Sequence, residues 1–504
     1  MAFAAGYWSF PGGGLKAEDH QARSRFSLVE PAAVSDLPAD VLESGSSIVP
    51  LLNTAEEADE DDGFDHAPFV AALAREVAEE TGFHIDLATA RIAPAGRLVT
   101  PEFSPIRFDA RFYLVSVDRD AVLDITASDG ELVDGCWIRP SEALARWKRC
   151  EWVISAPVLA LLQGLIAGPG GDRGGDGDGG LEESGDSVQA SGSPDDSPDD
   201  SPDDLATSAG RCGQVARIAS RWPRVFPLLP TISLAPVRTP TLPPATHTNV
   251  YFLGARDVIV VDPASPYDDE REALDESIAL LQADRRLVEI WLTHHHADHV
   301  GGVSYLKERY GLPVAAHPRT AALLAGRVEV DRHLADGEVL ELSGDPPCRL
   351  RVVYTPGHAP GHICILEEHS RFLVAGDMIA GIGTILVEPS EGDMAQYLDS
   401  LERMKGLDPA ALLPAHGSAI VTPAAARAKL DQYVEHRLWR ERQVLAAVVE
   451  CGRATSKELV TVAYKDVPAA IHPLAELSLV AHLVKLVGDG RVARDGDSWH
   501  AATG

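Results

Sequence analysis

The sequence predicts a multi-domain α/β protein that ends in a small helical module. The chain has 504 residues, which is more than one ordinary domain holds. Hydrophobic residues make up 45% and charged residues 24% of it, a globular composition. Short apolar runs alternate with helical segments through most of the chain, whereas residues 431–504 have the pattern of helices followed by a hairpin.

Composition divides the chain into four segments. We expect an α/β domain over residues 1–167, a linker over 168–210, a second α/β domain over 211–430 and the C-terminal module over 431–504. Gly, Asp, Ser and Pro dominate the linker, and it carries three successive Ser-Pro-Asp-Asp repeats. With few apolar groups and strong self-repulsion, such a segment cannot offset its ordering entropy. It is therefore predicted to be a flexible tether, with an acidic decoy for a basic partner as the alternative.

Charge and cysteine usage exclude several classes of protein. The formal charge of −32, from 76 acidic and 44 basic residues, repels nucleic-acid phosphates, so DNA is not an expected partner. Six cysteines without CxxC spacing indicate reduced thiols and a cytoplasmic location. No signal peptide is apparent, and the apolar run from Trp152 to Ala167 is short for a membrane span. We expect that run to form a buried helix that closes the first domain, and no membrane association.

The first domain carries carboxylates at helical spacing. Glu76, Glu79 and Glu80 stand at i, i+3 and i+4 in a helical pattern that begins near Pro68, so they share one face. Adjacent carboxylates repel one another unless a cation lies among them, and hard oxygen ligands suit Mg²⁺ or Mn²⁺. The alternative is a solvated acidic face.

These carboxylates lie in a motif that resembles the Nudix box. Phe10-Pro-Gly-Gly-Gly14 precedes Arg75-Glu-Val-Ala-Glu-Glu-Thr-Gly82, with Asp19 at the position of the first glutamate of the box and 55 residues between Asp19 and Arg75. Together with Thr100-Pro-Glu-Phe-Ser-Pro, this insertion resembles the acyl-CoA diphosphatase branch, which carries an interrupted box.

The resemblance covers roughly residues 3–165 and implies a Nudix-like α/β/α sandwich. It implies Mg²⁺ or Mn²⁺ at Glu76, Glu79 and Glu80, and a catalytic role for Glu79. Only eleven residues precede Gly12, too few for the strands that normally come first. Either the true start lies upstream or the domain is incomplete, so we expect the domain as written to be weak or inactive.

The second α/β domain carries the strongest motif, Thr293-His-His-His-Ala-Asp-His299. It follows the apolar run that ends at Leu292, where a buried strand opens into a loop. Imidazole and carboxylate are ligands that suit zinc and similar divalent ions. Four potential ligands within six residues can serve two metals from one loop.

Three more potential ligands also follow apolar runs. His358 follows Leu350–Tyr354, Asp377 follows Phe372–Ala375, and His416 follows Ala411–Leu413. Ligands converge at one edge of a sheet most simply if the strands that carry them are neighbours. We therefore predict that the four clusters form one site at the edge of a sheet.

In this order the HxHxDH, TPGH, GD and AHG elements resemble the metallo-β-lactamase-fold hydrolases, over about residues 230–430. The resemblance implies an αβ/βα four-layer sandwich with two zinc ions, or iron or manganese, at one edge. His294, His296 and His358 would hold the first ion, Asp298, His299 and His416 would hold the second, and Asp377 would bridge them. Two such ions lower the pKa of a shared water, which attacks a carbonyl or phosphorus, with Asp298 orienting it or moving its proton.

Three further polar residues near these motifs have open roles. His295 is expected to point away from the ions or to support a ligand. His362 either donates a hydrogen bond to the site or is a simple turn residue. Asp262 either supports the ligands by hydrogen bonding or starts a turn after its strand.

The segments Gly381–Leu401 and Glu435–Gln443 resemble the lactamase-like-protein-2 branch, whose members include endoribonucleases and thioesterases. The loop Thr355-Pro-Gly-His-Ala-Pro-Gly-His362 resembles that of glyoxalase-II-like thioesterases and favours thioester hydrolysis. The expected substrate is thus a small-molecule or carrier-protein thioester, such as acyl-CoA or an acyl-carrier protein. The alternative is an endoribonuclease of the same branch, with RNA as its substrate.

The C-terminal module is predicted to be winged-helix-like. Helical patterns cover Tyr433–Glu450, Ser456–Tyr464 and Leu474–Val487, and an Asp-Gly turn after Arg491 marks a hairpin. Residues 431–504 contain nine basic and ten acidic side chains, a poor electrostatic footprint for RNA. This balance favours the thioesterase over the nuclease.

Overall fold

The computed structural model describes residues 16, 19, 27–28, 64–99, 109–118, 121–122, 124, 135–166, 208–209, 212, 224–282 and 284–502. Chain contacts separate two compact units, and the second takes in residues 223–504 together with Lys148–Val153. Most of the predicted linker, the Phe10–Gly14 segment and most of the insertion after Asp19 lie outside the described residues. Their expected properties stay predictions.

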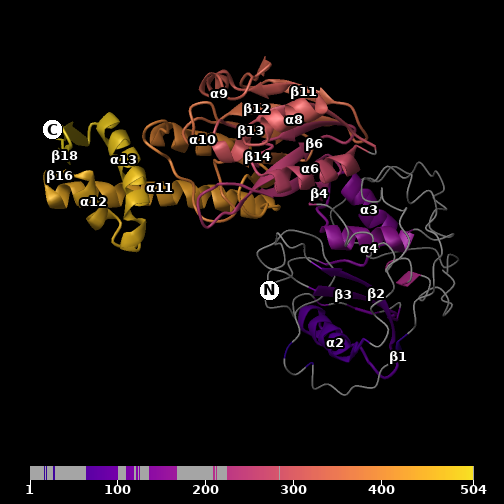
Figure 1. Ribbon diagram of the computed structural model, residues 1–504. Helices are drawn as coiled ribbons and strands as arrows, with labels where there is room; N and C mark the ends of the chain where they lie inside the picture. The colour runs from indigo at the N-terminus through magenta and orange to yellow at the C-terminus, as the bar shows by residue number, and fades with distance from the viewer. Residues whose placement is uncertain are drawn as a thin grey trace, which may run out of the picture. The chain divides into compact units, whose positions relative to one another are not determined.

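The first unit contains a three-stranded sheet in the order β1-β2-β3 (Figure 1). Strands β1 and β2 are parallel, and β2 and β3 are antiparallel. The helix predicted to begin near Pro68 is α2, which ends at Gly82 in the left-handed conformation that glycine favours. The predicted buried helix is α4, and Leu161 on it packs with Ala95 and Leu98 of β2. The elements are β1 (Ser27–Leu28), α2 (Ala67–Thr81), β2 (Arg91–Val99), β3 (Asp109–Val115), α3 (Pro140–Lys148) and α4 (Ala156–Ile166).

The α/β part of the second unit is built on two sheets. The larger sheet has seven strands in the order β10-β9-β8-β7-β6-β5-β4. Its apolar strands, such as Asp257–Val261, are buried along nearly their whole length, as expected for strands covered on both faces. The strands are β4 (Phe226–Leu229), β5 (Ile232–Arg238), β6 (His247–Leu253), β7 (Asp257–Val261), β8 (Arg286–Leu292), β9 (Val314–Ala316) and β10 (Arg332–His333). The helices that belong to it are α6 (Asp268–Leu281), α7 (Ala297–Val300), α8 (Val303–Tyr310) and α9 (Pro318–Leu324).

The smaller sheet has five strands in the order β11-β12-β13-β14-β15. All its pairs are antiparallel except β14 and β15, which are parallel and joined through the helix α10. The strands are β11 (Val339–Leu342), β12 (Cys348–Tyr354), β13 (Ile363–Glu367), β14 (Phe372–Gly376) and β15 (Ala411–Pro414). The helices that follow β14 and β15 are α10 (Met394–Gly406) and α11 (Pro423–Cys451).

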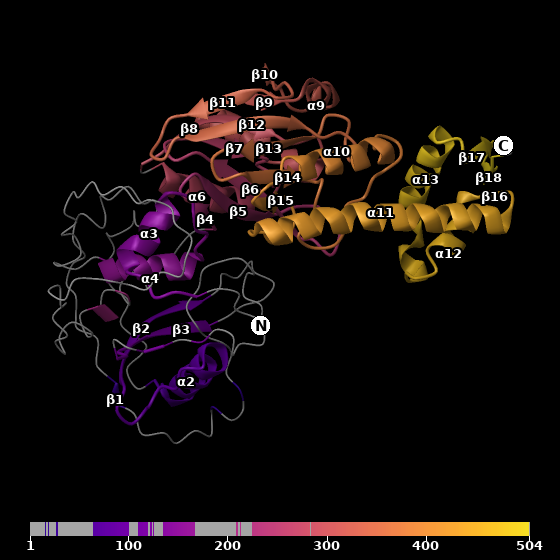
Figure 2. The same cartoon turned by 180° about the vertical axis from the view of Figure 1, so that it is seen from behind.

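Three apolar cores stack these elements into four layers (Figure 2). Trp291 of β8 and Val352 of β12 belong to the core between the two sheets. Ile278 of α6 belongs to the core on the outer face of the larger sheet, and Tyr397 of α10 to the core on the outer face of the smaller one. The predicted αβ/βα sandwich is confirmed.

The strands that carry the metal motifs are not neighbours in one sheet, so that part of the prediction is wrong. Strand β8 lies in the larger sheet, whereas β12, β14 and β15 lie in the smaller one, with β13 between β12 and β14. The motifs meet because the two sheets pack face to face and their ends lie at one edge of the sandwich. Each motif still follows its strand as predicted.

The C-terminal module packs three helices against a three-stranded sheet in the order β16-β18-β17. Its core joins Val444 of α11, Leu459 of α12, Leu483 of α13 and Trp499 of β18. The predicted helices and hairpin are confirmed, and β16 is an additional strand. The elements are β16 (Ala454–Thr455), α12 (Ser456–Ala463), a 3₁₀ turn η3 (Ala469–Ile471), α13 (His472–Gly488), β17 (Val492–Asp495) and β18 (Ser498–Ala501).

The first helix of this module begins earlier than predicted. The sequence pattern predicts it from Tyr433, but α11 begins at Pro423, behind the N-cap Thr422, whose side chain accepts a hydrogen bond from the Ala425 N–H. Proline at the first helical position and threonine before it are the local signals of this start. The predicted boundary between residues 430 and 431 therefore falls inside one continuous helix.

One helical stretch of the C-terminal module, Ala469–Gly488, is long and apolar enough to cross a membrane when judged by length and composition alone. Leu479, Leu483 and Leu486 of this stretch are fully buried in the core of the module. A core helix passes the same test, so its composition does not indicate a span.

Gly357 allows α10 to approach the loop that carries His358. Its φ of +135° is one that side-chain-bearing residues rarely adopt, and an added Cβ would lie 2.3 Å from Tyr397 Cα. Strain and overpacking predict that Gly357→Ala lowers the free energy of unfolding by about 2–5 kcal/mol. Chemical denaturation measures this, and Gly406→Ala, where an added Cβ meets nothing within 4 Å, is the control. Equal denaturation midpoints for the two variants would contradict the prediction.

Candidate metal centre

The loop after β8 is anchored by Asp262, at the end of the neighbouring strand β7. Asp262 Oδ1 accepts the Thr293 N–H at 2.8 Å, and Oδ2 accepts the Thr293 hydroxyl at 2.5 Å. Oδ2 also accepts a hydrogen bond from His299 Nδ1 at 2.9 Å. Asp262 is 2% exposed, so these bonds replace the water that its carboxylate loses. Of its two predicted roles, support of the ligands by hydrogen bonding is confirmed.

Three histidine nitrogens converge at one point beside this loop. His294 Nε2 lies 2.9 Å from His296 Nδ1, and His358 Nε2 lies 3.0 Å from the same atom. All three side chains come from the two loops that follow β8 and β12. These are the residues that the sequence assigns to the first ion.

The outer ring nitrogens of these histidines decide where their protons lie. The Thr293 hydroxyl donates to Asp262 and therefore accepts from His294 Nδ1, at 3.0 Å. His358 Nδ1 donates to the Leu386 carbonyl at 2.9 Å, and His296 Nε2 donates to Glu391 Oε1 at 2.6 Å. In neutral rings the converging nitrogens then carry lone pairs, which repel one another unless a cation lies between them. The donor set fits a divalent ion such as zinc, which binds imidazole at about 2.0–2.1 Å.

Asp298, His299 and His416 form a second group whose ligand atoms all lie within 4.8 Å of one another. His416 Nε2 lies 3.6 Å from Asp298 Oδ2, and His416 Nδ1 donates to the His247 carbonyl at 2.9 Å. His299 is fully buried, and its Nδ1 is held by Asp262. This is the set that the sequence assigns to the second ion.

Asp377 lies between the two groups. Its Oδ2 is 3.5 Å from His358 Nε2 of the first group, and its Oδ1 is 3.5 Å from His299 Nε2 and 3.4 Å from His416 Nε2. Within the described residues, neither Asp377 Oδ1 nor His299 Nε2 has a hydrogen-bond partner, although both atoms are buried. Unsatisfied buried atoms that face one another in this way fit the bridging role predicted for Asp377.

Burial and neighbouring charges shift the pKa values of these groups in opposite directions. Burial lowers the pKa of His358 to about 4, which keeps its ring neutral and able to bind a cation. Burial alone would raise the pKa of Asp377, but His416 and His299 lower it well below its usual range. Burial would lower the pKa of His299, but Asp377 and Asp262 raise it well above its usual value. The two histidines thus favour the ionised form of Asp377.

Two other histidines of the motifs support the ligands. His295 Nε2 donates to Glu391 Oε2 at 2.9 Å, so its ring is directed to the carboxylate that also holds His296. His362 Nε2 accepts the Asp377 N–H at 3.1 Å, while its Nδ1 bonds Thr355 Oγ1 at 2.9 Å. His362 thus supports the site by accepting a backbone hydrogen bond and is more than a turn residue.

Sequence reasoning missed Glu391, which lies just before α10. It follows no predicted strand and has no ligand spacing to the histidines, since it is far from His296 in the chain. The only local signal is an acidic residue in the Glu388-Pro-Ser-Glu391-Gly segment. That signal does not distinguish a turn residue from a partner of the metal centre.

Two carboxylates of α2, those of Glu76 and Glu79, face basic side chains. Arg75 forms ion pairs with Glu76 at 2.6 Å and with Glu79 at 3.1 Å, and Lys16 pairs with Glu79 at 3.1 Å. Glu79 is exposed, whereas Glu80 is 8% exposed. The groups of potential ligand atoms found in the described part of the chain do not include Glu76, Glu79 or Glu80. Their predicted Mg²⁺ or Mn²⁺ site stays a prediction.

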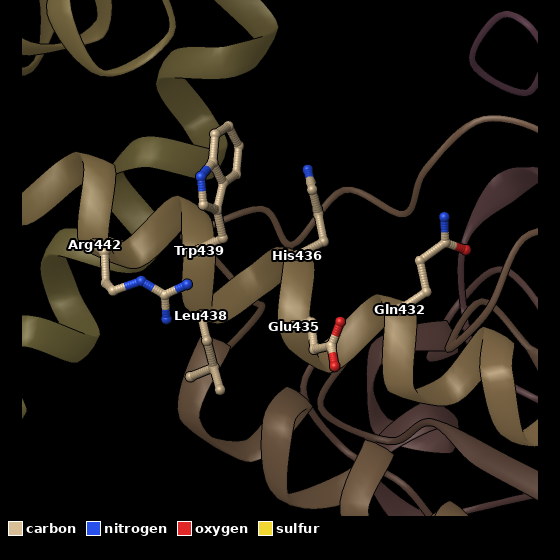
Figure 3. A pocket seen from close by; sticks show the side chains of 6 residues that line it. All are labelled: Gln432, Glu435, His436, Leu438, Trp439 and Arg442. Atoms are coloured by element: carbon tan, nitrogen blue, oxygen red, sulfur yellow. The ribbon is translucent and has the colours of Figure 1, made fainter.

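An open hollow of about 470 Å³ lies along α11, away from the metal ligands. Figure 3 shows Trp439 and His436 on one side of the helix and Leu438 and Glu435 on the other. All the lining side chains come from α11 alone, so the hollow is a surface of one helix and not an enclosed pocket: Gln432, Glu435, His436, Leu438, Trp439 and Arg442.

The second half of the chain is similar to known proteins. Residues 243–416 match the model of the Metallo-beta-lactamase superfamily, and residues 455–499 match the Beta-lactamase associated winged helix domain. Proteins named Beta-lactamase-like protein 2 homolog from Caenorhabditis elegans and Drosophila melanogaster are 30% and 31% identical to it. Those alignments cover 49% and 50% of this chain and 80% and 86% of the two relatives.

Two further similarities involve a fungal protein and a solved structure. A protein named Atrochrysone carboxyl ACP thioesterase from Aspergillus chevalieri is 30% identical over 49% of this chain and 77% of its own length. The crystal structure of a metallo-beta-lactamase family protein from Thermus thermophilus has a TM-score of 0.45 and 27% identity. It covers 55% of this chain and all of that one.

The two ligand groups predict that the protein binds about two zinc ions per chain. His294→Ala removes a ligand of the first group only, so it is expected to retain about one ion. Elemental analysis after dialysis against metal-free buffer measures the stoichiometry. The control is His333→Ala, which replaces an exposed histidine of β10 and is expected to retain about two ions. Two ions in His294→Ala would contradict the assignment.

Proposed function

The chain belongs to the metallo-beta-lactamase superfamily, and we propose that its metal centre hydrolyses a thioester. The observation that carries this proposal is the convergence of two ligand groups on Asp377. Such a pair of sites suits hydrolysis of an electrophilic carbonyl. The Thr355–His362 loop, which resembles that of glyoxalase-II-like thioesterases, and the 30% identity to a protein named as an ACP thioesterase support a thioester substrate.

The reaction divides between the bound ions and the residues around them. The ions, which we propose to be two zinc ions with iron or manganese as alternatives, supply an activated water and positive charge for the oxygen that becomes negative. Asp298 is the best placed residue to accept a proton, because its side chain is 17% exposed while those of His299 and His416 are 0% and 6% exposed. Its carboxylate reaches solvent and lies beside the second group. We therefore propose that Asp298 orients the water and accepts its proton at an Oδ atom.

The thiolate released from a thioester is a better leaving group than the amine released from an amide. The departing sulfur therefore needs less help from a proton donor than a departing nitrogen does. A thiol has a pKa near 8.5, and a thiolate can leave with little assistance at neutral pH. None of the ligand residues then needs to act as a strong acid. This agrees with a centre in which burial keeps His358 neutral.

We propose a small-molecule or carrier-protein thioester as the substrate, such as acyl-CoA or an acyl-carrier protein, and a cytoplasmic location without DNA or membrane partners. Endoribonuclease activity is the alternative, because the same ions can activate water towards a phosphodiester. The C-terminal module offers that alternative little support, since its nine basic side chains are balanced by ten acidic ones. An RNA substrate in the activity assay tests this alternative.

Asp298→Asn is expected to lower kcat for acyl-CoA hydrolysis by about 10²–10⁴-fold, because the amide cannot accept the proton. Thiol release with a chromogenic disulfide reagent measures the rate at saturating zinc. Asp268→Asn is the control, because the Asp268 side chain is 92% exposed and, in the described part of the chain, bonds Arg271 three residues away and no candidate ligand. Cleavage of RNA with no thiol release from any acyl-CoA or acyl-carrier protein would replace the thioesterase proposal with the nuclease.

For the first half of the chain we propose a Nudix-like diphosphate hydrolase that uses Mg²⁺ or Mn²⁺. The supporting observation is the pairing of Asp19 with Arg75 through two hydrogen bonds, of 3.2 Å from Nε and 2.9 Å from Nη2. Arg75 lowers the pKa of Asp19, and Asp19 is only 4% exposed. This pair joins the two parts of the interrupted motif across 55 intervening residues, with Asp19 in the position of the missing glutamate.

With Mg²⁺ present, the full chain is expected to cleave the diphosphate of coenzyme A weakly, and Glu79→Gln is expected to abolish this cleavage. Glu79 is the exposed carboxylate of the α2 face, so its loss removes a proposed Mg²⁺ ligand without emptying a core position. Chromatography of the nucleotide product measures the cut. Glu142→Gln, on the exposed surface of α3, is the matched control. Equal cleavage by the two variants would exclude Glu79 from the reaction. If the unaltered chain cleaves no coenzyme A, the first half of the chain is a binding domain without diphosphatase activity.

A further inference from the structure

The segment Gly381–Gly392, between β14 and α10, touches three of the metal-binding histidines. The Gly381 N–H donates to the His416 carbonyl at 2.7 Å, and the Leu386 carbonyl accepts from His358 Nδ1 at 2.9 Å. Glu391, near the end of the segment, accepts from His296 Nε2 at 2.6 Å. We call Gly381–Gly392 the strap. It contacts ligands of both groups without supplying a predicted ligand itself.

Glu391 makes the most specific of these contacts. One carboxylate oxygen binds His296 and the other binds His295, at 2.6 and 2.9 Å. Both distances are those of charge-assisted hydrogen bonds. Because both oxygens are engaged by consecutive residues, neither ring can rotate without breaking a bond to an ionised carboxylate.

We propose that Glu391 is a positioning residue that holds the His296 ring with its Nδ1 directed at the first ion. A carboxylate that accepts the outer N–H of a metal-binding imidazole selects the tautomer, fixes the ring plane and makes the inner nitrogen a better donor. His296 Nδ1 lies 2.9 Å from His294 Nε2 and 3.0 Å from His358 Nε2. An error in the orientation of this ring would therefore displace the shared point of all three ligands.

Helix α11 holds the strap itself, and α10 and α11 hold the backbone just before it. Arg437 of α11 is 3% exposed and donates to the Ile385 carbonyl, next to the carbonyl that binds His358. The Tyr433 hydroxyl accepts the Ala380 N–H at 3.0 Å, and the Tyr397 hydroxyl donates to the Met378 carbonyl at 2.8 Å. These bonds fix the backbone just before the strap and at its middle. The segment that carries Glu391 is therefore attached to α11 at its middle.

A third ion at His295, His296 and Glu391 is the competing explanation, since their ligand atoms also lie within 4.8 Å of one another. The geometry favours hydrogen bonds. His296 can direct an unprotonated Nδ1 at the first ion only if Nε2 keeps its proton, and that proton points at Glu391. A metal stoichiometry above two would support the third ion instead.

The test compares Glu391→Gln with Glu388→Gln in the full chain. The first change keeps the shape of the side chain and removes its charge. Glu388 lies in the same strap, and among the described residues its side chain bonds Ser390 and no metal-binding histidine, so its change is the matched control. Zinc affinity is measured by competition with a chelator, and the geometry of the first site by the visible absorption of the cobalt(II)-loaded protein.

Glu391→Gln is expected to weaken binding of the first ion by about 10–100-fold and to alter the cobalt spectrum. Glu388→Gln is expected to match the unaltered protein in both, and Glu391→Asp to recover part of the affinity through its retained charge. Unchanged zinc affinity and cobalt spectrum in Glu391→Gln would overturn the proposal, whether or not the metal-free variant melts at a lower temperature. If the unaltered chain binds three ions and Glu391→Gln binds two, Glu391 is a metal ligand and not a positioning residue. The inference rests on the proposed metal centre but needs no substrate, so failure to hydrolyse thioesters leaves it standing.

Discussion

Inside the second unit, lone pairs of imidazole rings and a buried carboxylate face one another at short range. His296 Nδ1 lies 2.9 Å from His294 Nε2 and 3.0 Å from His358 Nε2. In neutral rings none of these three nitrogens carries a proton, because each outer nitrogen donates its proton to another group. Such an arrangement is unfavourable in a medium of low dielectric constant unless a cation compensates it. The surrounding fold must therefore hold the rings in place against their mutual repulsion.

That support comes from hydrogen bonds to the outer side of each ring. Asp262 holds His299, the carbonyls of His247 and Leu386 hold His416 and His358, and Glu391 holds His296. These partners belong to strands or loops of both sheets. The geometry of the site consequently depends on how the two sheets pack. That contact contains a large apolar core. It also contains direct hydrogen bonds: the Tyr251 hydroxyl donates to the carbonyl of Pro414, two residues before His416, at 2.8 Å.

The long helix α11 connects this support to the C-terminal module. Near the middle of α11, Tyr433 and Arg437 form hydrogen bonds with the backbone between β14 and α10. One turn later, Arg440 bonds Asp466 and the Ala463 carbonyl of the C-terminal module. A helix that is continuous from Pro423 to Cys451 makes the module part of the scaffold around the metal centre. The balanced charge of the module agrees with such a structural role better than with a role in reading nucleic acid.

The sequence by itself identified the candidate ligands and the elements that carry them. Each motif directly follows an apolar run, and both the run and the ligand chemistry are local properties of a few neighbouring residues. The four-layer arrangement was predicted from the resemblance of those motifs to the metallo-β-lactamase-fold hydrolases. Helix α11 was predicted too short because its start depends on a cap, Thr422-Pro423, outside the apolar pattern.

Only the tertiary structure decided which strands bring the ligands together and which residues hold them. The motifs meet across two packed sheets, and no local pattern records which sheet a strand joins. Glu391 reaches His296 from a distant part of the chain, through a segment without regular structure. A hydrogen bond of this kind depends on the fold of the whole unit, because a single carboxylate in a turn has the same local sequence whether it faces water or a metal-binding ring.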